Sequence, residues 1–227
     1  MPTKLKWFIR TIFVLFMIYI YIADYSRGTF FSFLLLNTFL GYIPVELAMH
    51  INEKQNPIIF WLLFFFWLLF YPNAPYVLTD LFHLARFNPY DPTTGLMTLR
   101  LKMWLEFTNL ISSALGCTLM GLWSFDHFIN VIAIRWNKRS IPFRISLAFI
   151  LTILSSIGIY VGRFLRLHSA YLFTSPKWVV DLLIGMWNAR MLTFVIFMTI
   201  IQLIVWASVA IGRHSIYLYA KQNNLEI

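Results

Sequence analysis

Six long apolar runs constrain what this chain can fold into more than any other feature of its sequence. A helix that crosses about 30 Å of hydrocarbon at about 1.5 Å per residue needs about 20 apolar residues. Each run comes near that length. The pattern predicts an all-α fold, a polytopic membrane helix bundle whose six transmembrane helices cover residues 7–23, 30–49, 57–78, 103–125, 145–162 and 191–212.

The composition excludes a soluble protein. Apolar residues make up 60% of the 227 residues and charged residues 12%, whereas a soluble domain has about 45–50% and about 25%. Lys and Arg give the chain a net charge of +9. They punctuate the apolar runs instead of gathering on one face, as membrane anchoring requires. We therefore expect membrane lipids as partners and no nucleic acid.

The connections between the runs are too short to hold a soluble domain, so residues 1–227 are expected to form a single integral membrane domain. One connection contains an apolar stretch, residues 178–187, with Trp at each end. That pattern is typical of a short helix lying in the membrane interface, here before the sixth span. The basic cluster 135–144 resembles a cytoplasmic loop, which favours cytoplasmic N- and C-termini.

The third run is interrupted while still at membrane depth. Residues 57–70 reach only about 21 Å as a helix, and Pro72 and Pro75 then remove backbone donors. The carbonyls of Phe70 and Tyr71 lose their helical partners, and Asn73 is the nearest side-chain donor. We expect a helix broken at Pro72–Pro75, because irregular backbone at this depth is tolerated only against protein or a wet cavity.

Polar residues are concentrated at one end of the predicted bundle. In a six-span chain, the segments after spans one, three and five lie on the same side of the membrane. The residues placed there are Asp24 after span one, Asn73, Thr79, Asp80 and His83 after span three, and Arg163, Arg166 and His168 after span five, with Glu106 and Asn109 at the start of span four.

These residues suggest a candidate site without a metal or cofactor. Asp80 and His83 are one helical turn apart and could act as a catalytic acid–base pair, with Thr79 on the same face. Arg163 and Arg166 suit a phosphate or carboxylate, which Asn73 and Thr79 would orient. Equally, Asp80 could simply pair with Arg163 or Arg166 and pin span three to span five.

Small residues at four-residue spacing predict close helix packing. Gly158 and Gly162 form such a face on the fifth span, and Ser113, Cys117 and Gly121 form a matching stripe on the fourth. We expect these two spans to pack on each other.

Two motifs carry a resemblance to a known family. The first runs from Pro72 to Leu84 and reads PNAPYVLTDLFHL, and the second runs from Gly158 to Arg166 and reads GIYVGRFLR. Together they resemble the bacterial family called domain of unknown function 1361, with a likeness from about Phe33 to Leu183. The resemblance implies a multi-pass protein of the bacterial plasma membrane and supplies no activity.

Three hypotheses for function follow. The first is a polar site at the extracytoplasmic interface that binds or acts on a phosphorylated or acidic lipid headgroup. The second is a secondary transporter or proton-coupled carrier, which would need Asp80 or Glu46 to titrate, although Glu46 is expected to be an interfacial carboxylate. The third is a non-catalytic assembly subunit with a membrane-protein partner.

Overall fold

The structure, a computed structural model, describes residues 1–167 and 174–223 and contains no strand within those ranges. Six helical stretches are long and apolar enough to cross a membrane: Thr3–Tyr25, Phe30–Met49, Pro57–Arg86, Leu101–Arg135, Ile141–Leu165 and Ala189–Gln222. The predicted all-α bundle with six spans is confirmed, and the chain is a multi-pass membrane protein. It divides into two compact units, Met1–Ser140 and Ile141–Ile227.

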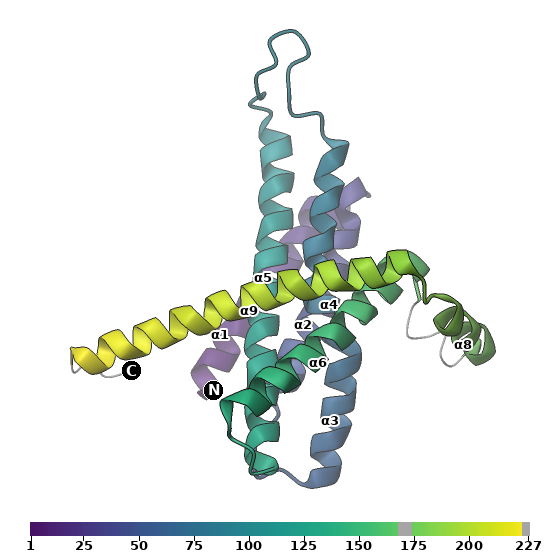
Figure 1. Ribbon diagram of the computed structural model, residues 1–227. Coiled ribbons are helices and arrows are strands. Elements are labelled where there is room, and N and C mark those ends of the chain that lie inside the picture. The colour runs from purple at the N-terminus through teal and green to yellow at the C-terminus, as the bar shows by residue number, and fades with distance from the viewer. Residues whose placement is uncertain (168–173, 224–227) are drawn as a thin grey trace. The chain divides into compact units, whose positions relative to one another are not determined.

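The first unit is built around α5 (Leu101–Arg135) and α2 (Phe33–Met49), which pack along each other. α1 (Thr3–Ile20) contacts α2 and continues into a π-helical turn, η1 (Tyr21–Tyr25). A short 3-10 turn, η2 (Phe30–Ser32), leads into α2. Figure 1 shows α5 in teal running along this unit, with the loop 87–100 at one end and the start of α3 near the other.

The third span is broken as the sequence predicts. α3 (Pro57–Phe70) ends before Pro72, a single turn α4 (Asn73–Tyr76) follows, and a 3-10 helix η3 (Val77–Arg86) completes the span. Asn73 Nδ2 donates to the Phe70 carbonyl at 2.9 Å. Ala74 N donates to the Tyr71 carbonyl and not to the Phe70 carbonyl, so the Asn73 side chain supplies the partner that the Phe70 carbonyl has lost.

The small-residue stripe of α5 packs against α2 and α4. Ser113 Oγ lies 2.7 Å from Thr38 Oγ1, and Cys117 Sγ lies 3.7 Å from the Thr38 carbonyl. A Cβ on Gly121 would come within 2.6 Å of the Ala74 Cβ. We expected this stripe to pack against the fifth span. That expectation is corrected, because α2 and the broken third span pack against the stripe.

Two helices are longer than predicted. α5 and α9 (Ala189–Gln222) have 35 and 34 residues, whereas their apolar runs end at 125 and 212. In α5, the polar pair after Phe125 continues the helix because Asp126 is buried and His127 Nε2 lies 3.0 Å from the Ile51 carbonyl. α5 therefore continues past the end of its apolar run because its next turn still has packing partners, whereas residues 211–219 at the end of α9 are exposed.

The second unit pairs α6 (Ile141–Tyr160) with α9 through buried polar side chains. Ser155 Oγ donates to Gln202 Oε1 at 2.9 Å, and Gln202 Nε2 donates to Ser156 Oγ at 2.9 Å. A π-helical turn, η4 (Val161–Leu165), extends α6. The helix predicted at 178–187 is present as α8 (Pro176–Gly185), and its interfacial position stays a prediction.

Candidate functional site

Asp80 is fully buried inside unit 1. It lies on η3 with 0% of its surface exposed, and Asn37 of α2 donates to its Oδ2 from Nδ2 at 2.7 Å. A buried carboxylate in a membrane span is costly and needs compensation by hydrogen bonds or charge. The Asn37 bond supplies part of that compensation and ties the broken third span to α2. Sequence analysis did not connect Asn37 with Asp80.

His83 lies one turn beyond Asp80 on η3 and is half-buried. Its Nδ1 is 2.9 Å from the Asp80 carbonyl and 3.9 Å from Asp80 Oδ1. Because a carbonyl only accepts, Nδ1 carries a proton, and Nε2 is the other ring nitrogen. The ring packs against Phe33, with centroids 4.3 Å apart. His83 is thus oriented by the backbone of Asp80, with Nε2 as the nitrogen left for proton transfer.

The 3-10 geometry of η3 changes which residues share a face. Three residues complete a turn of this helix, so Asp80 and His83 are aligned, whereas Thr79 and His83 are not. The expected common face of Thr79 and His83, which assumed an α-helix, is therefore wrong. Thr79 Oγ1 instead donates to the Tyr76 carbonyl at 2.7 Å.

The side chains of Asn73 and Thr79 each donate a hydrogen bond to a backbone carbonyl of the broken span. Their proposed role in orienting a ligand stays a prediction. Arg163 in η4 is half-buried, and Arg166 follows η4 as an exposed residue with a left-handed φ of 50°. Both belong to the second unit, and their pairing with Asp80 stays a prediction. His168 lies outside the described residues.

Glu46 sits in a network of partners near the end of α2. Arg10 of α1 donates to both of its oxygens, from Nη2 at 2.5 Å and from Nε at 3.0 Å. Tyr42 donates a further hydrogen bond, and His50 Nε2 lies 2.9 Å from Oε1. A bidentate pair of this kind holds the carboxylate in its charged form. Of the two carboxyls considered for proton coupling, Asp80 is therefore the better candidate.

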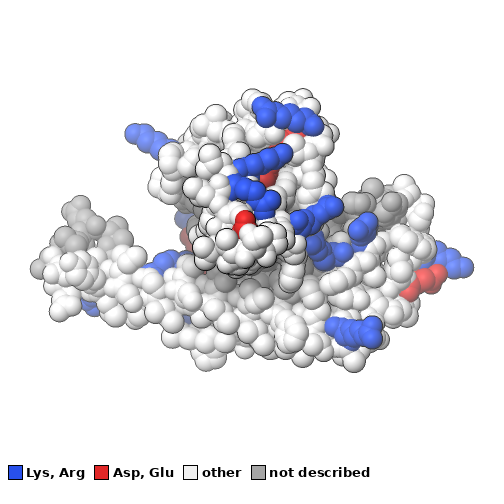
Figure 2. All heavy atoms as spheres, turned by 90° about the horizontal axis from the view of Figure 1, so that it is seen from above, with Lys and Arg blue, Asp and Glu red and all other residues white. Residues whose placement is uncertain are grey.

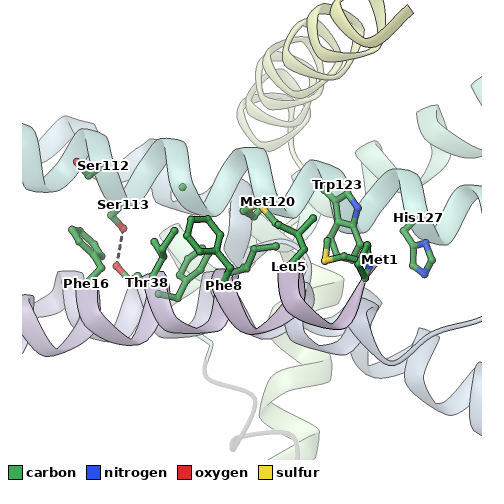
Figure 3. Close-up of a pocket in the computed structure, with 15 residues that line it drawn as sticks. Met1, Leu5, Phe8, Phe16, Thr38, Ser112, Ser113, Met120, Trp123 and His127 are labelled. Atoms are coloured by element: carbon green, nitrogen blue, oxygen red, sulfur yellow. Dashed lines mark hydrogen bonds between the residues drawn. The ribbon is translucent and has the colours of Figure 1, made fainter. Parts of the chain in front are cut away.

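An apolar groove between α1 and α5 was missed by sequence analysis. It has a volume of about 740 Å³. Figure 3 shows Phe16, Thr38 and Ser113 at one end and Met1, Trp123 and His127 at the other. The Thr38–Ser113 hydrogen bond crosses its inner wall. The sequence signal was the set of small residues Ser112, Ser113 and Gly116 on one face of the fourth span.

Basic side chains surround the end of unit 1 that carries the loop 87–100. Figure 2 looks down on this end and shows Lys and Arg in blue outnumbering the acidic residues in red. Exposed basic residues at the ends of the elements here are Arg27, Arg86, Arg100 and Lys102. The Arg86 guanidinium lies 3.8 Å from the centroid of the Phe30 ring. This end therefore attracts anions.

The family model described as "Protein of unknown function (DUF1361)" matches residues 36–205. The chain belongs to this family. The DUF1361 match includes Asp80, His83, Arg163 and Arg166, and it begins after α1, so one wall of the groove precedes it. No curated protein and no solved structure matches the chain.

Proposed function

We propose that this membrane protein binds a lipid with an acidic or phosphorylated headgroup, and that a hydrocarbon chain of the lipid occupies the groove between α1 and α5. The groove is the observation that carries the proposal. Its volume of about 740 Å³ lies within the range of about 300–1,000 Å³ usual for ligand pockets.

The lining of the groove suits a hydrocarbon chain. Phe8, Phe16 and Met120 contribute apolar surface, and the hydroxyls of Thr38 and Ser113 bond to each other. Because these two hydroxyls satisfy each other, an apolar occupant does not leave them without a hydrogen bond. The groove runs along α5 from Ser112 to His127, about 22 Å at the helical rise.

The headgroup part of the proposal depends on the basic residues. Arg163 and Arg166 of unit 2 are proposed on their chemistry alone as anion ligands, because guanidinium groups bind phosphate and carboxylate through two parallel hydrogen bonds. The exposed basic residues at the loop end of unit 1 would favour the same class of lipid. His83, oriented by Asp80, is the proposed acid–base group for any reaction on the headgroup.

Native mass spectrometry of the detergent-extracted protein tests the chain-binding groove. A Cβ on Gly116 meets no atom within 4 Å, so Gly116→Trp should fill the groove and abolish lipid adducts. Leu119→Trp adds the same side chain at an exposed position of α5 outside the groove lining and should keep them. Equal lipid retention in both variants would refute the proposal, as would a second protein in place of lipid.

The same spectra test the headgroup preference. When the protein is offered equal amounts of an anionic and a zwitterionic phospholipid, Arg163→Ala combined with Arg166→Ala should remove the preference for the anionic one. An unchanged preference would mean that other residues hold the anion.

A proton-coupled carrier is a second candidate, favoured by the fully buried Asp80 in the broken third span. Asp80→Asn keeps the size of the side chain and removes its charge. If the protein is a carrier, proton-driven flux into proteoliposomes should disappear in this variant, whereas Asp91→Asn in the exposed loop should transport normally. Flux that survives Asp80→Asn would rule out Asp80 as the coupling group.

A further inference from the structure

We propose that Asp24, Glu106 and Asn109 form a binding site for a hard divalent cation, Ca²⁺ or Mg²⁺. These three residues are called the acidic cluster below. Asp24 lies in the π-helical turn η1 that extends α1, and Glu106 and Asn109 are one turn apart on α5. The proposal is independent of whether the groove binds a lipid.

Two elements bring the acidic cluster together. Tyr19 of α1 donates from its hydroxyl to Asn109 Oδ1 at 3.1 Å, which fixes the end of α1 against the first turns of α5. The π turn that follows carries Asp24 into the interior, where its charge repels that of Glu106. π turns of this kind often occur at functional sites, since they displace one residue from the regular helical face.

The cluster is buried and incompletely satisfied. Asp24, Glu106 and Asn109 are 2%, 4% and 4% exposed. Thr29 Oγ1 donates to Asp24 Oδ1 at 2.8 Å. Five buried side-chain polar atoms in the described part of the chain lack a hydrogen-bond partner, and three of them are Asp24 Oδ2, Glu106 Oε2 and Asn109 Nδ2. Buried polar atoms without partners are rare in folded proteins, so their concentration here indicates a missing ligand.

The charge of the cluster identifies the class of ligand. Within the described residues, no Lys or Arg lies at ion-pair distance from Asp24 or Glu106, although Lys102 attracts the Glu106 carboxylate electrostatically. Two carboxylates removed from water are strongly destabilising unless a cation compensates them. One divalent ion neutralises both.

The donor atoms fit a hard cation and exclude a thiophilic one. Carboxylate, amide and hydroxyl oxygens are the ligands of Ca²⁺ and Mg²⁺. Among the described residues, no three or more His, Cys, Asp and Glu side chains lie close enough together to hold a metal ion by themselves. Neutral oxygens and water must therefore complete the coordination. Asn109 can present Oδ1 to the ion by rotating its amide, after which Nδ2 donates to Tyr19. Thr29 adds a hydroxyl oxygen.

The site lies one helical turn beyond the end of the groove. Tyr19 follows the groove residue Phe16 by one turn of α1, and Asn109 precedes Ser112 by one turn of α5. A cation at the cluster would hold this end of α1 against α5. Its release should therefore loosen the contact between the two helices.

Calorimetric titration of the purified full-length protein tests the proposal. After treatment with a chelator, the protein is titrated separately with CaCl₂ and MgCl₂, and its unfolding temperature is measured with and without each salt. We expect one ion per chain and a higher unfolding temperature with the ion bound. Glu106→Gln and Asp24→Asn should weaken binding by at least about tenfold, whereas Glu53→Gln, in an exposed loop, should not change it.

A gain-of-function variant separates a cation site from its alternatives. Asn109→Asp adds a third carboxylate, which should tighten cation binding and lower the unfolding temperature without the ion. If neither salt binds the wild-type protein and Glu106→Gln raises the unfolding temperature, the carboxyls share a proton and the proposal is wrong. If Asn109→Asp only destabilises the protein, with no gain in affinity, the proposal is also wrong.

Discussion

At the scale of single residues, two glycines of α5 have opposite roles although both lie on one helix. A Cβ on Gly121 would lie 2.6 Å from the Ala74 Cβ, which belongs to the rigid turn of the broken third span. A Cβ on Gly116 would meet nothing within 4 Å, because it would enter the groove. Gly121 sets a helix–helix distance, and Gly116 lines the groove.

This difference predicts opposite effects of the same substitution. Gly121→Ala should lower the free energy of unfolding by about 1–3 kcal/mol, because α4 must shift to admit the new methyl group. Gly116→Ala should raise it by up to about 1 kcal/mol, because Ala favours the helix and nothing opposes its side chain. Thermal unfolding of both variants in detergent measures the two effects. Equal effects of the two substitutions would contradict the packing of α4 against α5.

At the scale of elements, the sequence predicts what proline chemistry and apolar length dictate and misses what tertiary contacts decide. The break of the third span follows from Pro72 and Pro75, and its repair by Asn73 was expected for that reason. The 3-10 form of η3 was not, because a short segment adopts the geometry that its contacts with α5 and α2 allow. Local pattern cannot report such contacts.

The candidate site also has a part that local sequence predicts and a part that depends on contacts between distant segments. The Asp80–His83 spacing was readable from the sequence, since three residues form one turn of an α-helix or a 3-10 helix. The bond from Asn37 to Asp80 and the electrostatic repulsion between Asp24 and Glu106 involve segments far apart in the chain. Sequence analysis placed Asp24, Glu106 and Asn109 at one end of the bundle but not in one cluster. Only the path of the π turn and the Tyr19–Asn109 bond bring them together.

At the scale of the whole molecule, the six spans place the loop 87–100 on the side opposite to the N-terminus. With cytoplasmic termini, as the basic cluster 135–144 favours, this loop faces the extracytoplasmic side. Cys117→Ser removes the only thiol. In that background, Asn88→Cys should react with a membrane-impermeant maleimide added to intact cells.

A second reporter provides the control for orientation. Glu53→Cys, in the turn between α2 and α3, should react only after the cells are opened. The reverse labelling pattern would invert the orientation and move the proposed headgroup site to the cytoplasmic face.

The way α1 is attached also determines how a bulky ligand could reach the groove. α1 is attached in its middle by the Arg10–Glu46 pair and at its far end by the Tyr19–Asn109 bond. Between these two anchors, Phe13 is the only buried side chain. The second half of α1 is therefore held against the unit mainly by these two contacts and by Phe13. In the proposed function, a lipid would enter the groove from the side, directly from the surrounding bilayer, instead of crossing the polar surface at either end of the helix.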